Sequence, residues 1–183
     1  GVEMLAAADL PADRILAGES IRSDESAERL RAMDPDIVIS VLFGHVLPAA
    51  VLEIPRNGCI NLHPAYLPYN RGAYPNVWCI VDGTPAGVTL HYMDEGIDTG
   101  SIIAQERVPI SPCDTGETLY RKLELAGMSL FKTAWPAIRC GRISCVTQQR
   151  SLGTNHQVKD VEKIDQIDLD ATYTGRYLID LLR

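Results

Sequence analysis

The sequence predicts an α/β fold in which helices flank a mostly parallel, twisted, Rossmann-like sheet. Asp36–Phe43 (DIVISVLF) is a continuous apolar run rich in β-branched residues, typical of a central parallel strand buried on both faces. Ser23–Met33 before it and Ser111–Cys140 after it carry apolar residues at helical spacing. The 183 residues are 46% hydrophobic and 22% charged, which suits one globular domain with a sizeable core.

The other elements each have a local signal. Ser23 can cap the first helix, and Asp34-Pro35 ends it. Asp114 with Glu117 predicts a capping box for the long helix, Pro136 predicts a kink or break, and Gly141 predicts its end. Further strands are expected at Val2–Ala8, Cys59–Leu62, Ala86–Met93, Ser101–Val108 and Ile143–Thr147, and further helices at Val46–Leu52, Pro75–Val81 and Tyr173–Leu182.

Charge and cysteine usage exclude several classes of function. The net charge of −7 and the lack of a basic run argue against a nucleic-acid partner. The five cysteines include no CxxC pair, so they are interpreted as reduced thiols of a cytoplasmic protein. Without clustered His and Cys we expect no metal site. No apolar run approaches the ~20 residues of a membrane span, and we expect neither a membrane association nor a signal peptide.

The first polar motif is Asn61-Leu62-His63-Pro64, at the end of an apolar run. Asn61 and His63 are two residues apart, so on a strand they point to the same face, and Pro64 should end that strand. An amide can donate to a carbonyl oxygen, and an imidazole can donate or move a proton. The alternative is that Asn61 caps a turn and His63 is a structural histidine.

The second polar motif is Asp94–Gly100 (DEGIDTG), which interrupts two alternating runs. A glycine-bearing acidic loop between strands can present backbone groups and one carboxylate to a ligand. The alternative is a solvated turn.

Together, NLHPAYLP and HYMDEGIDTGSII resemble the folate-dependent formyltransferases. That superfamily includes glycinamide ribonucleotide transformylase, methionyl-tRNA formyltransferase and the nucleotide-sugar N-formyltransferases. The resemblance covers roughly Asp36 to Ile110, and YNRGAYPNVWCIVDGTPAGVTLHY is most similar to the sugar branch. It implies a formyltransferase fold, a catalytic trio of Asn61, His63 and Asp98, and 10-formyltetrahydrofolate as formyl donor.

The resemblance also implies binding residues. Those for the folate are Phe43, Gly44, His45, Val46, Met93, Asp94, Glu95 and Ile97. Arg71 and Trp78 are the candidates for substrate binding, through a planar fork and a stacking ring respectively. Alternatives stay open: His45 as a loop histidine, Arg71 as a surface residue, and Trp78 as packing. His91 is either a satisfied strand histidine or a support for the Asp98 loop.

The implied reaction is transfer of a formyl group to the primary amine of a small molecule, most simply a nucleotide-linked amino-deoxysugar. Alternatives are formylation of glycinamide ribonucleotide or methionyl-tRNA, release of formate by hydrolysis, and a non-catalytic folate-binding regulatory domain. We expect residues 1–147 to form the catalytic domain and residues 148–183 a C-terminal extension. The resemblance also implies that one strand–helix unit is missing before Val2–Ala8. Apolar residues near the end of the chain would leave a face to bury, so we expect either a partner, such as a second copy in a homodimer, or further C-terminal residues that cover it.

Overall fold

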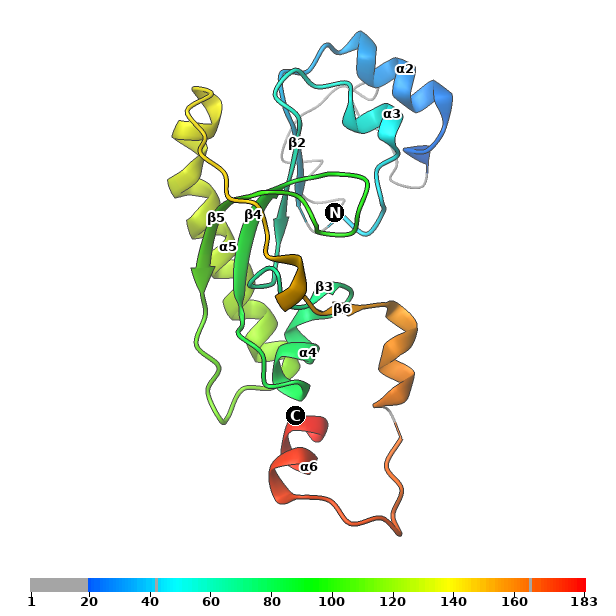
Figure 1. Ribbon diagram of the computed structural model, residues 1–183, viewed down its shortest axis with the longest axis vertical. Coiled ribbons are helices and arrows are strands. Elements are labelled where there is room, and N and C mark those ends of the chain that lie inside the picture. Colours follow the sequence, from blue (N-terminus) through cyan, green and yellow to red (C-terminus); the bar gives the residue numbers. More distant parts are fainter. Residues whose placement is uncertain (1–19, 42, 165) are drawn as a thin grey trace.

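The computed structural model describes residues 20–41, 43–164 and 166–183 (Figure 1). The predicted strand at Val2–Ala8 lies outside these residues. The main helices are α2 (Asp24–Ala32), α3 (Ala49–Leu52), α4 (Pro75–Val81), α5 (Gly116–Arg139) and α6 (Gly175–Leu182). The strands are β1 (Val38–Val41), β2 (Cys59–His63), β3 (Arg71–Gly72), β4 (Gly87–Tyr92), β5 (Ile102–Arg107) and β6 (Asn155–His156). Short 3₁₀ turns occupy Arg150–Leu152 and Val158–Lys163.

The central sheet has the strand order β1-β2-β4-β5. β1 and β2 run parallel, as the apolar run at Asp36–Phe43 led us to expect, with Ile39 opposite Ile60. β1 is shorter than that run and stands at one end of the described strand order, and only Ser40 in it is buried, so the expected central position and burial on both faces are not found among the described residues. β2 pairs antiparallel with β4, and β4 pairs antiparallel with β5. The sheet in the described residues is therefore mixed. The connection between β4 and β5 is short, as is usual between antiparallel neighbours.

Strand alternation sorts the side chains of this sheet onto two faces. Ile60, Val88 and Leu90 point to one face, where they pack against Leu119 and Leu123 of α5. On the other face, Cys59 packs against residues of α2 and α3, including Ala27 and Val51. Figure 1 shows α5 on one side of the sheet and the α2–α3 pair on the other. This arrangement confirms the α/β class with flanking helices.

The long helix α5 differs in detail from the sequence prediction. Its capping box is formed by Thr115 and Thr118, each side chain bonding the other's backbone N–H, so the predicted Asp114/Glu117 box was wrong. The Asp114 carboxylate instead accepts bonds from the Ser111 N–H and the Lys122 amine. Pro136 does not end the helix, which continues to Arg139, and Gly141 follows its end with φ +65°.

The C-terminal segment packs against the part of the chain that follows β2. β6 pairs in parallel with β3. The paired residues Arg71 and Asn155 are 84 positions apart in the sequence. The predicted strand at Ile143–Thr147 is reduced to one bridge between Val146 and Ile102. The helix α6 packs on α4 and leaves Ile179 and Leu182 exposed. The division at residue 147 stays a prediction. Within the described ranges, no helix has the length and apolarity that a membrane span requires.

Candidate active site

Two of the three candidate catalytic side chains project from β2. Asn61 and His63 share the sheet face opposite α5, because they alternate with the core residues Ile60 and Leu62. Opposite them on β4 stand His91 and Thr89, so one amide, two imidazoles and a hydroxyl form a polar patch on this face. His63 is buried, and its Nε2 lies 3.3 Å from the carbonyl oxygen of Asn70.

The third side chain, Asp98, comes from the loop between β4 and β5. The Asp94 carboxylate accepts a bond from the Gly96 N–H, 3.0 Å away, and a second from the Thr99 hydroxyl, which holds the loop in a compact turn. At Gly100, a Cβ would lie 1.8 Å from the carbonyl oxygen of Tyr92, so only glycine allows this close approach. Asp98 itself has φ +53°, a left-handed conformation that is uncommon outside glycine.

The structure brings the three predicted residues together. Asp98 Oδ1 lies 3.4 Å from Asn61 Nδ2, and Oδ2 lies 3.5 Å from His63 Nε2. Oδ2 also accepts a 2.8 Å hydrogen bond from the backbone N–H of Gly72 in β3. An amide, an imidazole and a carboxylate that are remote in sequence therefore meet at one point on the sheet.

Burial sets the charge states of this cluster. Burial lowers the pKa of His63 from 6.5; the negative charge of Asp98 opposes that shift, and His91 adds to it. Burial alone would raise the pKa of Asp98. The hydrogen bond with His91, the positive charge available on His63 and the Gly72 N–H outweigh it, and lower the pKa of Asp98 from 3.8 to about 2. At neutral pH the site therefore holds an ionised carboxylate beside a neutral His63.

His91 is part of the cluster, which supports the second of the two interpretations that the sequence left open. Its Nδ1 lies 2.7 Å from the carbonyl oxygen of Tyr92, an arrangement that requires Nδ1 to carry a proton. Its Nε2 then faces Asp98 Oδ1 at 3.5 Å and Asn61 Nδ2 at 3.3 Å. With its one proton on Nδ1, His91 accepts from the Asn61 amide through Nε2; it donates to the Asp98 carboxylate only when Nε2 is also protonated.

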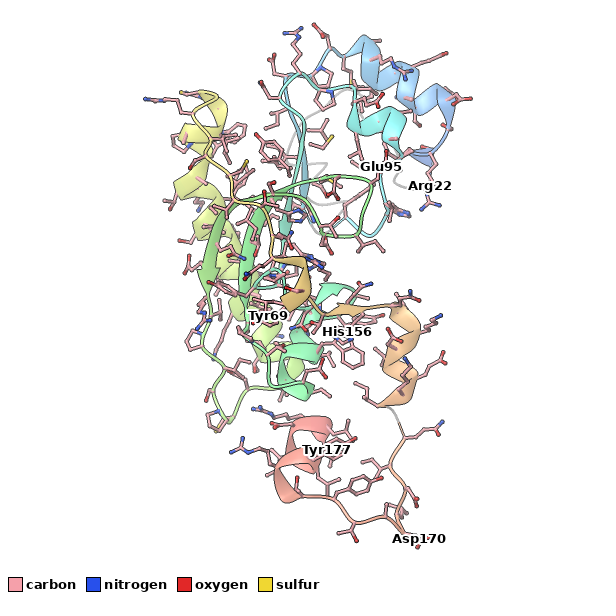
Figure 2. All side chains as sticks on the ribbon, viewed as in Figure 1. Arg22, Tyr69, Glu95, His156, Asp170 and Tyr177 are labelled. Carbon is pink, nitrogen blue, oxygen red and sulfur yellow. The ribbon has the colours of Figure 1, made fainter. Side chains whose placement is uncertain are left out.

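The two candidate substrate-binding residues are both inside the protein. The guanidinium of Arg71 donates from Nε and Nη2 to Gln148 Oε1, at 3.2 and 2.8 Å. Trp78 is 5% exposed and stacks on His156, with ring centroids 4.1 Å apart and an interplanar angle of 6°. Figure 2 shows His156 beside α4. The packing interpretation of Trp78 thus has direct support, and contact of either residue with a substrate stays a prediction.

The candidate folate-binding residues lie on two surface loops. Phe43 and Val46, after β1, are 38% and 47% exposed, and Ile97 in the β4–β5 loop is 46% exposed. Gly44, His45, Asp94 and Glu95 are also exposed, and Met93 is half-buried. Figure 1 shows the β4–β5 loop extending from the sheet toward the α2–α3 side. Phe43, Val46 and Ile97 are thus exposed apolar side chains, and ligand sites that hold an aromatic ring are lined by groups of this kind.

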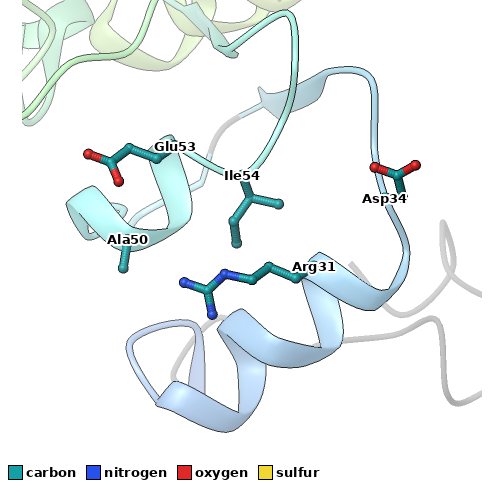
Figure 3. A pocket seen from close by; sticks show the side chains of 5 residues that line it. All are labelled: Arg31, Asp34, Ala50, Glu53 and Ile54. Atoms are coloured by element: carbon teal, nitrogen blue, oxygen red, sulfur yellow. The ribbon is translucent and has the colours of Figure 1, made fainter.

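Two surface cavities lie elsewhere. One, between α2 and α3, is lined by Arg31, Asp34, Ala50, Glu53 and Ile54 (Figure 3). The other lies between α4 and α6 and includes Cys79, Thr84 and Arg183 in its lining. Asn61, His63 and Asp98 line neither cavity.

Sequence reasoning missed two contributors to the site. Gly72 supplies a hydrogen bond to the Asp98 carboxylate, and the Gln148 side chain donates to the carbonyl oxygens of Asp98 and Gly100 at 2.8 and 2.7 Å. The glycine after Arg71 was visible as a turn signal. Gln148 stands in a stretch without periodicity, and nothing in the sequence around it signalled a contact with residue 98.

Comparisons with known proteins agree with this geometry. A family profile described as formyl transferase matches residues 5–134. A methionyl-tRNA formyltransferase from Trichlorobacter lovleyi is 40% identical over 124 residues, which are 67% of this chain and 39% of that protein. Another, from a Geobacillus species, is 38% identical over 154 residues, 82% of this chain and 48% of that protein. The chain thus spans less than half the length of these two curated relatives.

Solved structures of formyltransferases match between 80% and 89% of the chain. A sugar N-formyltransferase from a Shewanella species has a TM-score of 0.82 and 28% identity, covering 88% of this chain and 64% of that chain. A 4-N formyltransferase from Francisella tularensis has a TM-score of 0.81 and 32% identity, covering 89% and 66%. The formyltransferase PseJ from Anoxybacillus kamchatkensis, solved with UDP-4,6-dideoxy-4-formamido-L-AltNAc and tetrahydrofolate, has a TM-score of 0.70 and 37% identity, covering 80% and 76%.

The fold is therefore that of the formyltransferases, as the sequence motifs predicted. With 130 of its residues matched by the family profile, the chain belongs to the formyl transferase family.

Proposed function

We propose that the protein transfers a formyl group from 10-formyltetrahydrofolate to a primary amine, most simply that of a nucleotide-linked amino-deoxysugar. The observation that carries the proposal is that Asn61, His63 and Asp98 meet at one point. The Asp98 carboxylate oxygens lie 3.4 Å from Asn61 Nδ2 and 3.5 Å from His63 Nε2. Family membership and relatives solved with tetrahydrofolate support the folate as donor.

In this reaction the neutral amine attacks the formyl carbon, and negative charge develops on the formyl oxygen. Asn61 Nδ2 is the donor proposed to receive that oxygen, with His63 as a second donor beside it. Asn61 Nδ2 lies 3.3 Å from His91 Nε2 and 3.4 Å from Asp98 Oδ1, which orients the amide before substrate arrives; one of these two long contacts must be exchanged for the formyl oxygen, because the amide has only two N–H groups. An oriented donor needs little reorganisation when charge develops.

The bond that forms joins the amine nitrogen to the formyl carbon, and the bond that breaks joins that carbon to N10 of the folate. The amine must lose a proton, and the leaving N10 must gain one. Asp98 is ionised and His63 is neutral at neutral pH, so a proton can be accepted at this pair and returned to N10. We propose Phe43, Val46 and Ile97 as apolar contacts of the pterin ring, with the other candidate folate-binding residues around it: Gly44, His45, Met93, Asp94 and Glu95.

Three observations support a small amine as acceptor. The net charge is −7, which disfavours a polyanionic substrate. The likeness to sugar N-formyltransferases covers 88% of the chain, which is more than residues 1–134 can supply, so it extends into the segment after the family match. The solved relative that carries a nucleotide sugar is 37% identical.

Initiator tRNA is the second candidate acceptor, because the curated relatives at 38–40% identity are methionyl-tRNA formyltransferases. A tRNA substrate would require a basic surface that the overall charge of this chain does not suggest.

The test is formyl transfer from 10-formyltetrahydrofolate to a panel of amines: nucleotide-linked amino sugars, glycinamide ribonucleotide and methionyl-tRNA. We expect turnover with at least one amino sugar and none with the tRNA. Turnover with the tRNA alone would reassign the acceptor. Binding of the folate without transfer to any amine or to water would instead establish a non-catalytic folate-binding domain, and formate release would establish a hydrolase. Gel filtration of the same samples tests the predicted homodimer.

A further inference from the structure

We propose that the buried pair Arg71 and Gln148 is a positioning device for Asp98, and that it acts on formyl transfer only through the placement of that carboxylate. The inference rests on the proposed function, in which Asp98 is a proton acceptor. Both side chains of the pair are buried, with 8% and 6% of their residue surfaces exposed. Arg71 donates to Gln148, and Gln148 donates to the loop of residues 94–100 that carries Asp98, called here the catalytic loop.

Gln148 holds the main chain of the catalytic loop. Its Nε2 donates to the carbonyl oxygen of Asp98 at 2.8 Å and to that of Gly100 at 2.7 Å. A primary amide has two N–H groups, so both are used on this turn. Asp98 has a positive φ, an unfavourable conformation that persists only where surrounding contacts hold it in place. The two hydrogen bonds from Gln148 are such contacts, and they act on the main chain of Asp98 and Gly100.

Arg71 fixes which end of the Gln148 amide faces the loop. Its guanidinium donates two hydrogen bonds to Gln148 Oε1. A guanidinium has only donors, so it can pair only with the oxygen end of an amide. The NH₂ end must then point at Asp98 and Gly100. Without Arg71, the amide could turn over and place its oxygen against two carbonyl oxygens.

The same strand that carries Arg71 also holds the Asp98 side chain. Gly72, the next residue, donates its N–H to Asp98 Oδ2 at 2.8 Å. β3 is in turn fixed by the C-terminal segment, because the Arg71 N–H donates to the Thr154 carbonyl oxygen at 3.0 Å. Asp98 is thus held at its backbone by Gln148 and at its carboxylate by Gly72, and both restraints meet in the two residues of β3.

The test compares two substitutions at Gln148 with the same substitutions at its exposed neighbour Gln149. Gln148→Met keeps the length of the side chain and removes every donor. Gln148→Glu keeps an acceptor for Arg71 but puts an oxygen against the two carbonyl groups. Both should lower kcat about 10²-fold, as expected for a reacting group displaced by about 1 Å. KM for both substrates should stay unchanged, and the Gln149→Met and Gln149→Glu controls should match the parent protein.

A second arm separates positioning from general stabilisation. In an Asp98→Asn background there is no carboxylate to place, so Gln148→Met or Gln148→Glu should cause no further loss of kcat. If the losses multiply instead, Gln148 acts by another route and the proposal is overturned. Gln148→Glu retains a partner for Arg71, so it carries this arm if Gln148→Met does not fold.

A third arm needs no turnover. The Asp98 charge raises the pKa of His63, so displacement of Asp98 should make the His63 resonances titrate at lower pH in Gln148→Met than in Gln149→Met. An unchanged His63 titration together with unchanged kcat in folded Gln148→Met would overturn the proposal. If the parent protein formylates no amine yet the His63 titration moves, the proposed function fails while the positioning of Asp98 by Gln148 stands.

Discussion

Replacement of Asp98 by asparagine is the most direct test of the candidate active site. Asparagine has the same shape, but one of its two terminal groups becomes a donor. Asp98 Oδ2 receives the Gly72 N–H, and Oδ1 faces Asn61 Nδ2, so both positions need an acceptor. Whichever way the new amide is turned, one donor therefore faces another donor. The variant loses both the negative charge and one of these hydrogen bonds.

The structure gives magnitudes for both consequences. Loss of a group that moves a proton in the transition state typically costs about 10²–10⁴-fold in rate, and we expect kcat of Asp98→Asn to fall within that range. The pKa of Asp98 is lowered from 3.8 to about 2, which corresponds to about 2 kcal/mol of stability at neutral pH. Because the folded pKa is the lower one, this contribution is complete above the unfolded value and is lost as pH falls from about 4 to about 2.

The assay pairs formyl transfer at pH 7 with urea unfolding between pH 7 and pH 2. The parent protein should be more stable than Asp98→Asn at pH 7, and the difference should shrink as the pH drops below 4. The reasoning is refuted if folded Asp98→Asn transfers formyl groups at a rate close to that of the parent. It is also refuted if the stability difference persists unchanged at pH 2, because the carboxylate would then contribute nothing through its charge.

Three further predictions use matched pairs of variants or a single resonance. Gly72→Ala should destabilise the protein and lower kcat, because at φ +87° the new Cβ would lie 2.3 Å from the His156 carbonyl oxygen. The control is Gly83→Ala, which has a similar φ of +66° but open space around the Cβ. It should show only the cost of backbone strain in thermal unfolding and keep full activity. Thr115→Ala should cost about 1 kcal/mol in urea unfolding by removing the N-cap of α5, whereas Thr133→Ala within the same helix should cost none. The His63 resonances should titrate below pH 6.5, because burial lowers the pKa of that imidazole; titration above that value would contradict the buried geometry.

Strand periodicity alone placed two catalytic side chains correctly relative to each other. Asn61 and His63 are two residues apart on a strand, so they share a face. The apolar residues Ile60 and Leu62, which alternate with them, point to the other face, and that face packs on α5. The position of Asp98 was different. Its assignment came from the resemblance, because no local rule states that a seven-residue acidic loop returns to the middle of the neighbouring strand.

The sheet direction and the role of the C-terminal segment could not be obtained from local signals. An apolar run such as β1 predicts burial but does not determine whether the next neighbour is parallel, and β4 joined β2 in the antiparallel sense. β6 has two residues, too few for any periodic signal, yet its pairing with β3 supports the loop that holds Asp98. Likewise the capping box of α5 formed at Thr115 and Thr118, because Asp114 was taken by Lys122.

The contacts around Asp98 explain why the catalytic trio is not self-sufficient. All three members lie within residues 5–134, where the family profile matches. Of the groups that hold Asp98, Gly72 lies within that region, but Gln148 lies beyond it, and β3, which carries Gly72, is itself fixed by Thr154 and His156. A residue held in an unfavourable backbone conformation relaxes when its restraints are removed, and its side chain then moves with it. The segment after residue 134 therefore belongs to the site physically, although it contributes none of the predicted catalytic side chains.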